Sequence, residues 1–587
     1  MEVEIFTALR LAHLPAVMDV LRRTGALDVI DHAVREDPRS KVSTSECVAV
    51  IMCGVFLGHH DLWRMADRLG PYDMATIMRD PGFALTEFTE ERLARALDTL
   101  FDTGLERLMS GIALQAIEQF RLGTDFLHFD TTSLSFYGAY ENEELGATTD
   151  DSGQPPVVTY GYSKDHRPDL KQVLFGSLVT RDGGVPLYGK ALNGNRSDSE
   201  SAAEFFQQVR QLVEDPRNVC CVSDSKGWCA PVLAVVQAEG LRLLSRLPRH
   251  HRLHREVMAK PPGGRRVERP VKKGKEEAEY YELTGFDVEE SLFVDRQEGP
   301  NQTRREKLVI PARAVRVFSS ALHKKKMATL ERTRMTEAKE AKRRIADWQA
   351  LAYVCRDDAE RAARRHETEA GFVTLDVEAR VIRLDGPFRR GRGRPRKHEE
   401  PCLDAESHFR VTYATRSADE VEIDTRLRTA ATFVQIRTRN KGWNIADEEM
   451  IDHYRDQYLC EHGFSWLKTG AGPKGINPIY LEKPKRIAAL CFLYVLGLMI
   501  HNLIQRTVRK NLNKWGMGLP YHRNKPSDRI TTRFYFELFA KMQSVTYRLG
   551  GQEPRKQILG VNSNISLAAK ALGMKADVLL PVMENRT

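Results

Sequence analysis

The chain has 587 residues, 42% of them hydrophobic and 29% charged, with a formal net charge of +9 and a pI near 9.0. This length predicts roughly three to five domains, and the composition is that of an ordinary soluble globular protein. The nine cysteines have no CxxC spacing, which argues against a zinc ribbon or a disulfide framework and fits a reducing cytoplasm. The small basic excess favours a polyanionic partner.

Residues 1–122 show helical periodicity, as in "ERLARALDTLFDTGLERLMSGIALQAIEQF", and few strand signals, so we expect a helical N-terminal domain. The start "MEVEIF" is too acidic for a signal peptide. The most membrane-like run is residues 487–504, but it contains His501 and Asn502 and stands alone. A buried core helix is the favoured interpretation of this run, and a membrane span is the alternative.

Residues 123–248 change to strand patterns, beginning with "FLHFDTTSLSFYG", "VLFGSLVT" and "VPLYGKAL". A helix capped by Ser197 or Asp198 follows, then the strand "NVCCVSD" ending at Asp224, the helix "APVLAVVQAEG" and the strand "LRLLSRL". A meander of three strands followed by strand and helix alternation is the order of an RNase H-like sheet. The sequence therefore predicts an α/β protein with an RNase H-like catalytic core, in which helices flank a mixed sheet.

Residues 249–428 break this pattern with basic segments and short strand candidates, and they predict an inserted, partly β region with a basic surface. The core resumes over residues 429–505, where "NIADEEMIDHYRDQYLCEHGFSWLK" predicts one helix with Asn444 and Asp447 at its start. Residues 506–587 form a basic C-terminal tail region, for which the sequence suggests no role.

Three carboxylates have the placement of a catalytic set. Asp130 stands inside an apolar strand, where an unpaired ionised carboxylate costs several kcal/mol or shifts its pKa, and Asp224 ends a second buried strand. Glu461 lies seven residues from both Tyr454 and Lys468, so the three project from one helix face. Two aspartates and a glutamate suit two Mg²⁺ ions, with Mn²⁺ as a substitute, which could activate a water or a 3′-hydroxyl at a phosphodiester.

Five segments resemble the DDE transposases of bacterial insertion sequences: "HFDTTSLSFYG", "GYSKDHRPDLKQ", "GNRSD", "VSDSKGW" and "YRDQYLCEHGFSWLK". The resemblance is to the IS-four-type superfamily and its IS-sixteen-thirty-four-like subgroup, over roughly residues 124–247 and 430–505. It implies metal-dependent cleavage of double-stranded DNA at transposon ends, followed by strand transfer of the freed 3′-hydroxyl into target DNA. Asp130, Asp224 and Glu461 would be the catalytic residues and metal ligands, and we expect at least a homodimer assembled on DNA.

The same resemblance implies that Tyr454 and Lys468 contact phosphates of the transposon end. The family motif has an arginine where this chain has Gln457, and Arg455 is near enough to compensate. A separate motif, "GRGRPRK", resembles an AT-hook, in which Gly and Pro permit an extended backbone whose arginines enter a narrow A·T minor groove. The arginines of this motif are Arg392, Arg394 and Arg396.

Several alternatives remain open at this stage. Lys164, His166 and Arg167 could contact DNA or bridge a loop, and Trp348 and Trp443 could stack on an extruded base, although core packing is favoured for both tryptophans. Two other functions are compatible with the sequence. One is an RNase H-like DNA endonuclease that cuts without joining, and the other is a catalytically inactive DNA-binding protein that acts through the basic insertion.

Overall fold

A computed structural model describes residues 3–59, 61–138, 140, 153–261, 263–269, 278–299, 302–386, 407–469, 479–549, 552–575 and 578. The chain divides into two compact units. Unit 1 holds residues 1–248, 288–313 and 436–587, and unit 2 holds residues 249–287 and 314–435. Each unit is described by itself below, and all three predicted catalytic carboxylates belong to unit 1.

The N-terminal part of unit 1 is helical, as predicted, apart from its first strand. Helix α3 shows why these helices form: the Ser43 hydroxyl accepts from the Glu46 N–H, and the Glu46 carboxylate accepts from the Ser43 N–H. This reciprocal cap fixes the start of an almost fully buried apolar helix. The helices are α1 (Leu14–Arg23), α2 (Ala26–Ala33), α3 (Thr44–Phe56), α4 (Met65–Leu69), α5 (Met74–Met78), α6 (Glu90–Thr103) and α7 (Leu105–Phe120).

The first strand, β1 (Val3–Arg10), was not predicted from the sequence. It pairs antiparallel with β15 (Gln543–Leu549), which pairs in turn with β16 (Arg555–Leu559), so the two ends of the described chain share a three-stranded sheet. The other C-terminal elements are β13 (Leu519–Pro520), β14 (Pro526–Ser527), α18 (Thr532–Leu538) and α19 (Ser563–Leu572).

The central sheet of unit 1 has the predicted connectivity. Strands β2 (Phe126–Phe136), β3 (Lys171–Thr180) and β4 (Pro186–Leu192) form an antiparallel meander. Strands β5 (Cys220–Val222) and β6 (Arg242–Arg246) then add parallel to β2. These five strands follow the order β4-β3-β2-β5-β6. The remaining strands are β12 (Thr432–Thr438), β9 (Gln302–Ser319), β8 (Tyr280–Gly299) and β7 (Arg265–Glu268), of which β7 belongs to unit 2.

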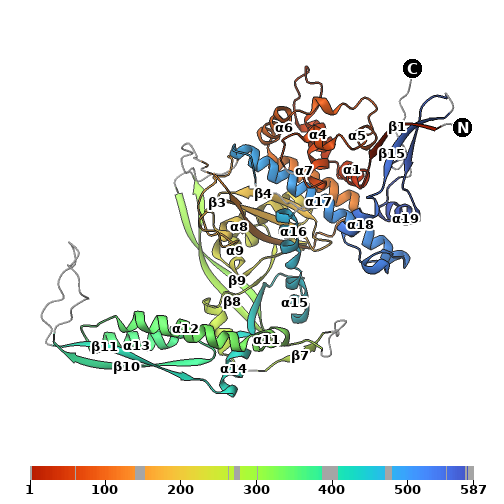
Figure 1. The fold of residues 1–587 in the computed structure, drawn as a ribbon. Helices are drawn as coiled ribbons and strands as arrows, with labels where there is room; N and C mark the ends of the chain where they lie inside the picture. The colour runs from red at the N-terminus through yellow and green to blue at the C-terminus, as the bar shows by residue number, and fades with distance from the viewer. Residues whose placement is uncertain are drawn as a thin grey trace. The chain divides into compact units, whose positions relative to one another are not determined.

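Helices cover both faces of this sheet (Figure 1). Helix α8 (Asp198–Leu212) begins after the Ser197 cap, and its Phe205 packs where a Cβ on Gly176 of β3 would clash. The preceding residue of β3, Phe175, points to the other face of the sheet and contacts Phe464 of α16 (Tyr458–Thr469). A Cβ on Gly189 of β4 would meet α17 (Pro484–Trp515), so α16 and α17 cover the face opposite α8. Helix α9 (Ala230–Ala238) packs beside α8.

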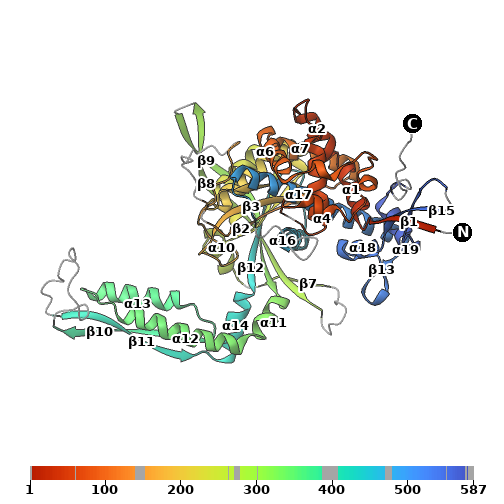
Figure 2. The same ribbon diagram turned by 45° about the horizontal axis from the view of Figure 1, so that its top comes forward.

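Helix α17 is the buried core helix predicted for residues 487–504. Among the described residues it is the one helix with the length and hydropathy of a membrane span, and 94% of its most apolar window is buried inside the structure. It packs against the N-terminal helices α6, α3, α7 and α1 and against β4 (Figure 2). The side of α17 that is apolar enough for lipid is therefore occupied by protein.

The single helix predicted around Tyr454 and Glu461 is wrong. The chain forms two helices, α15 (Asp447–Arg455) and α16, with Asp456 and Gln457 in a turn between them. The predicted start at Asn444 is also corrected: Ala446 precedes the first helical residue, and its N–H donates to the Glu449 carboxylate at 2.7 Å. Three carboxylates do crowd the first turn, as expected from the helix dipole.

Unit 2 is built on a hairpin of two long strands, β10 (Leu375–Asp385) and β11 (Ser407–Ser417), with two helices packed on it. Trp348 stacks on His366 with ring centroids 4.5 Å apart and contacts Tyr413, so its ring belongs to the packing under the hairpin. This confirms core packing for Trp348. The helices of unit 2 are α10 (Arg252–Ala259), α11 (Ser320–Met327), α12 (Leu330–Gln349), α13 (Arg356–Ala370) and α14 (Glu420–Ala430).

Candidate active site

Asp130 lies in the middle of β2, on the sheet face that α16 and α17 cover. Strand β2 is buried along its length except at two partly exposed positions, and Asp130 is one of them. Its pKa is raised to about 6, chiefly by burial, and the negative charges of Asp224 and Asp198 raise it as well. The ammonium of Lys164 and the N–H of Thr131, which donates to Asp130 Oδ1 at 2.7 Å, act in the opposite direction.

Asp224 follows the parallel neighbour of β2. His128 of β2 is paired with Val222 of β5, so Asp130 and Asp224 each stand two residues beyond a paired position of adjacent parallel strands. The Asp224 carboxylate accepts from the Lys226 N–H at 3.0 Å and so caps a short 3₁₀ turn, Ser225–Gly227. A Cβ at Gly227 would lie 1.7 Å from Ser223 Oγ, which explains why this tight turn needs glycine.

Glu461 and Tyr454 complete the carboxylate side of the site from α16 and α15. The pKa of Tyr454 is raised to about 12, first by burial, and Asp224, Asp130 and Glu461 all add to this increase. The pKa of the buried Cys460 thiol is likewise raised by burial and by the charges of Asp130 and Glu461. One phenol therefore lies within electrostatic reach of all three carboxylates that the sequence singled out.

The donor set suits a hard divalent cation, because carboxylate oxygens are the ligands that Mg²⁺ prefers. Asp130, Asp224 and Glu461 would hold it, and the ion would supply Lewis-acid stabilisation of a phosphodiester. Within the described ranges, however, no three His, Cys, Asp or Glu side chains gather closely enough to hold an ion. Instead, Lys164 Nζ lies 3.6 Å from Asp130 Oδ1, so a built-in cation is the nearest charge partner of this carboxylate.

Asp198 is a fourth carboxylate of the site, and the sequence predicts it only as a possible helix cap. The Thr131 hydroxyl donates to Asp198 at 2.6 Å, Lys164 Nζ lies 3.5 Å from it, and Lys226 Nζ donates to it as well. Burial raises the pKa of Asp198, but the bonds from Lys226 and Thr131 and the charge of Lys164 hold it below its usual value. Lys164 also donates to the Thr131 carbonyl at 2.7 Å. Asp198, Thr131, Lys164 and Lys226 therefore form one connected network of hydrogen bonds and ion pairs.

The side chain of Gln457 forms hydrogen bonds to strand β2. Its amide Nε2 donates to the Phe129 carbonyl at 2.7 Å, and its Oε1 lies 3.2 Å from His128 Nδ1. Burial lowers the pKa of His128 to about 4, so its ring is neutral at pH 7. Gln457 thus ties the turn between α15 and α16 to the two residues that precede Asp130.

The other predicted DNA contacts differ in placement. Lys468 Nζ donates to both carboxylate oxygens of Asp165, at 2.6 and 2.8 Å, and Arg455 is exposed at the end of α15. Arg167 pairs with Asp169. The AT-hook-like arginines lie outside the described residues: Arg392, Arg394 and Arg396.

Trp443 is 8% exposed and lies beneath the guanidinium groups of Arg242 and Arg437, at 5.4 and 5.1 Å from its ring centre. Core packing is therefore confirmed for this tryptophan as well.

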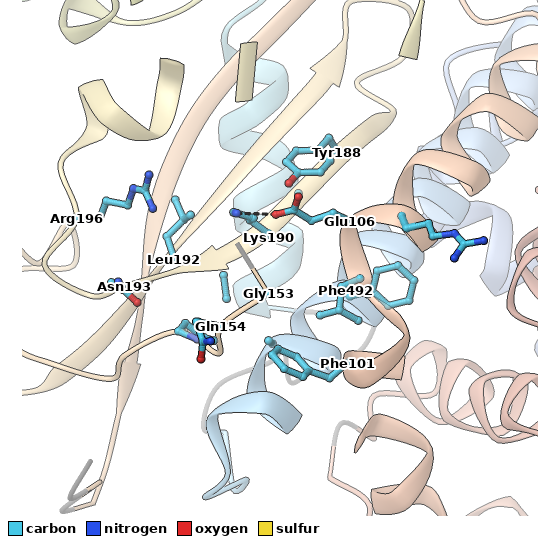
Figure 3. A pocket seen from close by; sticks show the side chains of 17 residues that line it. Phe101, Glu106, Gly153, Gln154, Tyr188, Lys190, Leu192, Asn193, Arg196 and Phe492 are labelled. Atoms are coloured by element: carbon cyan, nitrogen blue, oxygen red, sulfur yellow. Dashed lines mark hydrogen bonds and ion pairs between the residues drawn. The ribbon is translucent and has the colours of Figure 1, made fainter. Parts of the chain in front are cut away.

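A separate cavity of about 290 Å³ lies at the β4 edge of the sheet (Figure 3). Apolar rings of Phe101 and Phe492 line it, and Lys190 Nζ donates to Glu106 at 2.7 Å in its wall. Lys190 of β4 is paired with Gly176 of β3, and Gly176 lies on the sheet face that α8 covers. Asp130 is paired with Ser177, so its side chain lies on the opposite face, toward α16. None of the predicted site residues lines this cavity.

Residues 6–114 match one known family, described as a domain of unknown function (DUF4277). No curated protein matches the chain. Among solved structures, similarity is found to a piggyBac transposase synaptic complex with hairpin DNA, with a TM-score of 0.34 and 9% identity over 98% of this chain and 84% of that one. A pre-cleavage Mos1 transpososome is also similar, with a TM-score of 0.13 and 11% identity over 36% and 60% of the two chains. At these TM-scores the alignments do not establish a common fold.

Proposed function

We propose that this chain is a DDE-type DNA transposase of an insertion sequence, with an RNase H-like core that cuts double-stranded DNA at the transposon ends and joins the 3′-hydroxyl to target DNA. The observation that carries the proposal is the placement of Asp130. A carboxylate with a raised pKa stands in the middle of a buried strand, beside Asp224 at the end of the parallel neighbour. Such a group lowers the stability of the fold when it is ionised, and groups of this kind cluster at functional sites.

The roles of the other residues follow from their surroundings. Tyr454 keeps its proton at neutral pH, because its pKa is about 12, and it can donate a hydrogen bond to a phosphate oxygen beside the carboxylates. Lys468 would exchange Asp165 for an end phosphate, since partly exposed ion pairs are weak. Lys164 would balance the charge of Asp130 and Asp198 before Mg²⁺ or Mn²⁺ enters.

Arg455 and the AT-hook-like arginines would add contacts to the DNA backbone and minor groove. Two ends must be cut together, so we expect a homodimer or a larger assembly on DNA, acting in the cytoplasm. The family motif has arginine at the position of Gln457. In this chain Gln457 bonds to Phe129 and His128, so we assign it a structural role and no phosphate contact.

The direct test is cleavage of DNA that carries the element's own ends, with Mg²⁺ or Mn²⁺. Asp130→Asn and Glu461→Gln should each remove cutting while DNA binding remains, and Asp215→Asn serves as the matched control because Asp215 pairs with Arg217 at the surface. Cutting that survives in Asp130→Asn would contradict the proposal. Cutting without any joining would favour the endonuclease, and binding without cutting in the wild type would favour the inactive DNA-binding protein.

A further inference from the structure

Some of the exposed tyrosines lie near residues of the carboxylate site. Among the described residues, the tyrosines with exposed side chains are Tyr137, Tyr160, Tyr162, Tyr458 and Tyr480. Tyr162 is 80% exposed and stands two residues before Lys164, whose ammonium meets Asp130. Tyr458 opens the helix that carries Glu461. An isolated exposed aromatic ring is ordinary, but Tyr137, Tyr162 and Tyr458 each stand in or next to a segment that carries a residue of this site, and this pattern needs an explanation.

Two of these tyrosines lie on one line along β2. Lys164 N–H donates to the Ser133 hydroxyl, and the guanidinium of Arg167 lies over the ring of Tyr137 at 5.9 Å. The segment 162–167 therefore runs beside the end of β2, from Thr131 to Tyr137, over about 20 Å. We call the exposed side chains along this line the tyrosine strip: Tyr137, Tyr162, Arg167 and Lys226.

Each tyrosine ring of the strip has a cation over it. Lys226 Nζ lies 5.7 Å from the centre of the Tyr162 ring, and Arg167 takes the same place at Tyr137. Both cations already have carboxylate partners, Asp198 and Asp169. The strip is therefore not a strongly positive surface, and attraction to phosphates alone does not explain it. Tyr162 and Tyr137 are 80% and 61% exposed, so each ring keeps accessible surface although a paired cation lies over it, and such rings are suited to stacking on bases.

From this arrangement we infer that the tyrosine strip binds a short unpaired DNA strand and leads it to the carboxylates. Bases can stack on Tyr162 and Tyr137 only when they have left the duplex, because their faces are otherwise covered by neighbouring pairs. The inference rests on the proposed function and names its substrate more narrowly, as DNA whose strand near the cut is unpaired. Lys226 and Arg167 would then hold the phosphates that join the stacked bases.

The test is binding of full-length protein to two fluorescent DNAs in EDTA, where no cutting occurs. One is a blunt duplex, and the other is the same duplex with a short unpaired 3′ end. The wild type should bind the unpaired end about tenfold more tightly or better, in keeping with the usual strength of base stacking on an aromatic ring. Tyr162→Ala should lose most of this preference, and Tyr162→Phe should keep it, because the ring and not the hydroxyl does the stacking.

The matched control is Trp63→Ala. Trp63 is 57% exposed and is flanked by Arg64 and Arg68 at 5.3 and 5.6 Å, but it belongs to the N-terminal helical region. Its loss should leave the preference unchanged. Equal binding of both DNAs by the wild type, or a preference that survives Tyr162→Ala, would overturn the inference. The binding assay contains EDTA, so it does not depend on cutting. If the preference depends on Tyr162 but the protein never cuts DNA, the inference about the tyrosine strip holds and only the proposed function is refuted.

Discussion

Replacing Asp130 with asparagine should make the protein more stable at neutral pH, although it removes the central catalytic group. The pKa of Asp130 is raised from 3.8 to about 6 by burial, a shift of about two units that already includes the opposing charge of Lys164. One unit is worth about 1.4 kcal/mol, so the ionised carboxylate lowers the free energy of unfolding by up to about 3 kcal/mol. Asparagine keeps the shape and can still accept from the Thr131 N–H.

The sign of this effect depends on pH in a defined way. Near pH 4 the carboxyl is protonated in the folded chain and costs nothing, so the wild type and Asp130→Asn should be about equally stable. As the pH rises from about 4 to 6, the unfolded chain releases this proton more readily than the folded chain, and the wild type loses stability relative to the variant. Above pH 6 the difference should stay constant at up to about 3 kcal/mol.

The assay is urea unfolding of the full chain at several pH values between 4 and 8. Asp182→Asn is the matched control with the opposite sign. Burial raises the pKa of Asp182, but the hydrogen bonds from Arg506 and the Gly123 N–H hold it below its usual value, so the asparagine variant should be less stable at neutral pH. If Asp130→Asn is destabilised by a similar amount at pH 7, then Asp130 is a structural carboxylate and the reasoning is refuted.

Three further outcomes are expected. Gln457→Ala removes the hydrogen bonds to Phe129 and His128, and it should lower the free energy of unfolding by about 2 kcal/mol in urea titrations. Gln457→Arg should also destabilise the protein, and it should not strengthen DNA binding in anisotropy measurements. Asp198→Asn should lower the free energy of unfolding at pH 7, because the pKa of Asp198 is held below 3.8 in the folded chain. This loss should shrink only as the pH falls below about 3.8, which urea unfolding at pH 7 and under more acidic conditions can measure. Lys164→Met should raise the affinity for Mn²⁺, measured by calorimetry, because the ammonium beside Asp130 repels the ion; an unchanged affinity would show that Lys164 does not compete with it.

The elements that local patterning specifies were predicted from the sequence, and those that depend on distant partners were not. Short apolar runs bounded by turn residues predicted β2, β3 and β4, and Asp130 was noticed because it interrupts the apolar run of β2. Strand β1 was missed, since its partner β15 lies at the other end of the chain. A single strand with an ordinary composition gives no sign of such a pairing.

The break between α15 and α16 was missed for the same physical reason. Helical periodicity runs unbroken through Gln457, but its side chain bonds to Phe129, 328 residues earlier in the chain. The role of Asp198 was hidden because its partner Thr131 is 67 residues away, and from the sequence alone it reads as a helix cap. In both cases the missing information is a tertiary hydrogen bond.

The measurement that tests the central claim most directly is strand joining. Pre-cut DNA ends with a 3′-hydroxyl are incubated with target plasmid and Mg²⁺, beside identical ends with a 3′-deoxy terminus, for the wild type and Glu461→Gln. Joined products that form only with the 3′-hydroxyl and only in the wild type are the result expected of a transposase. If the wild type cuts the ends but never joins them, or joins them equally well with Glu461→Gln, the transposase account is contradicted.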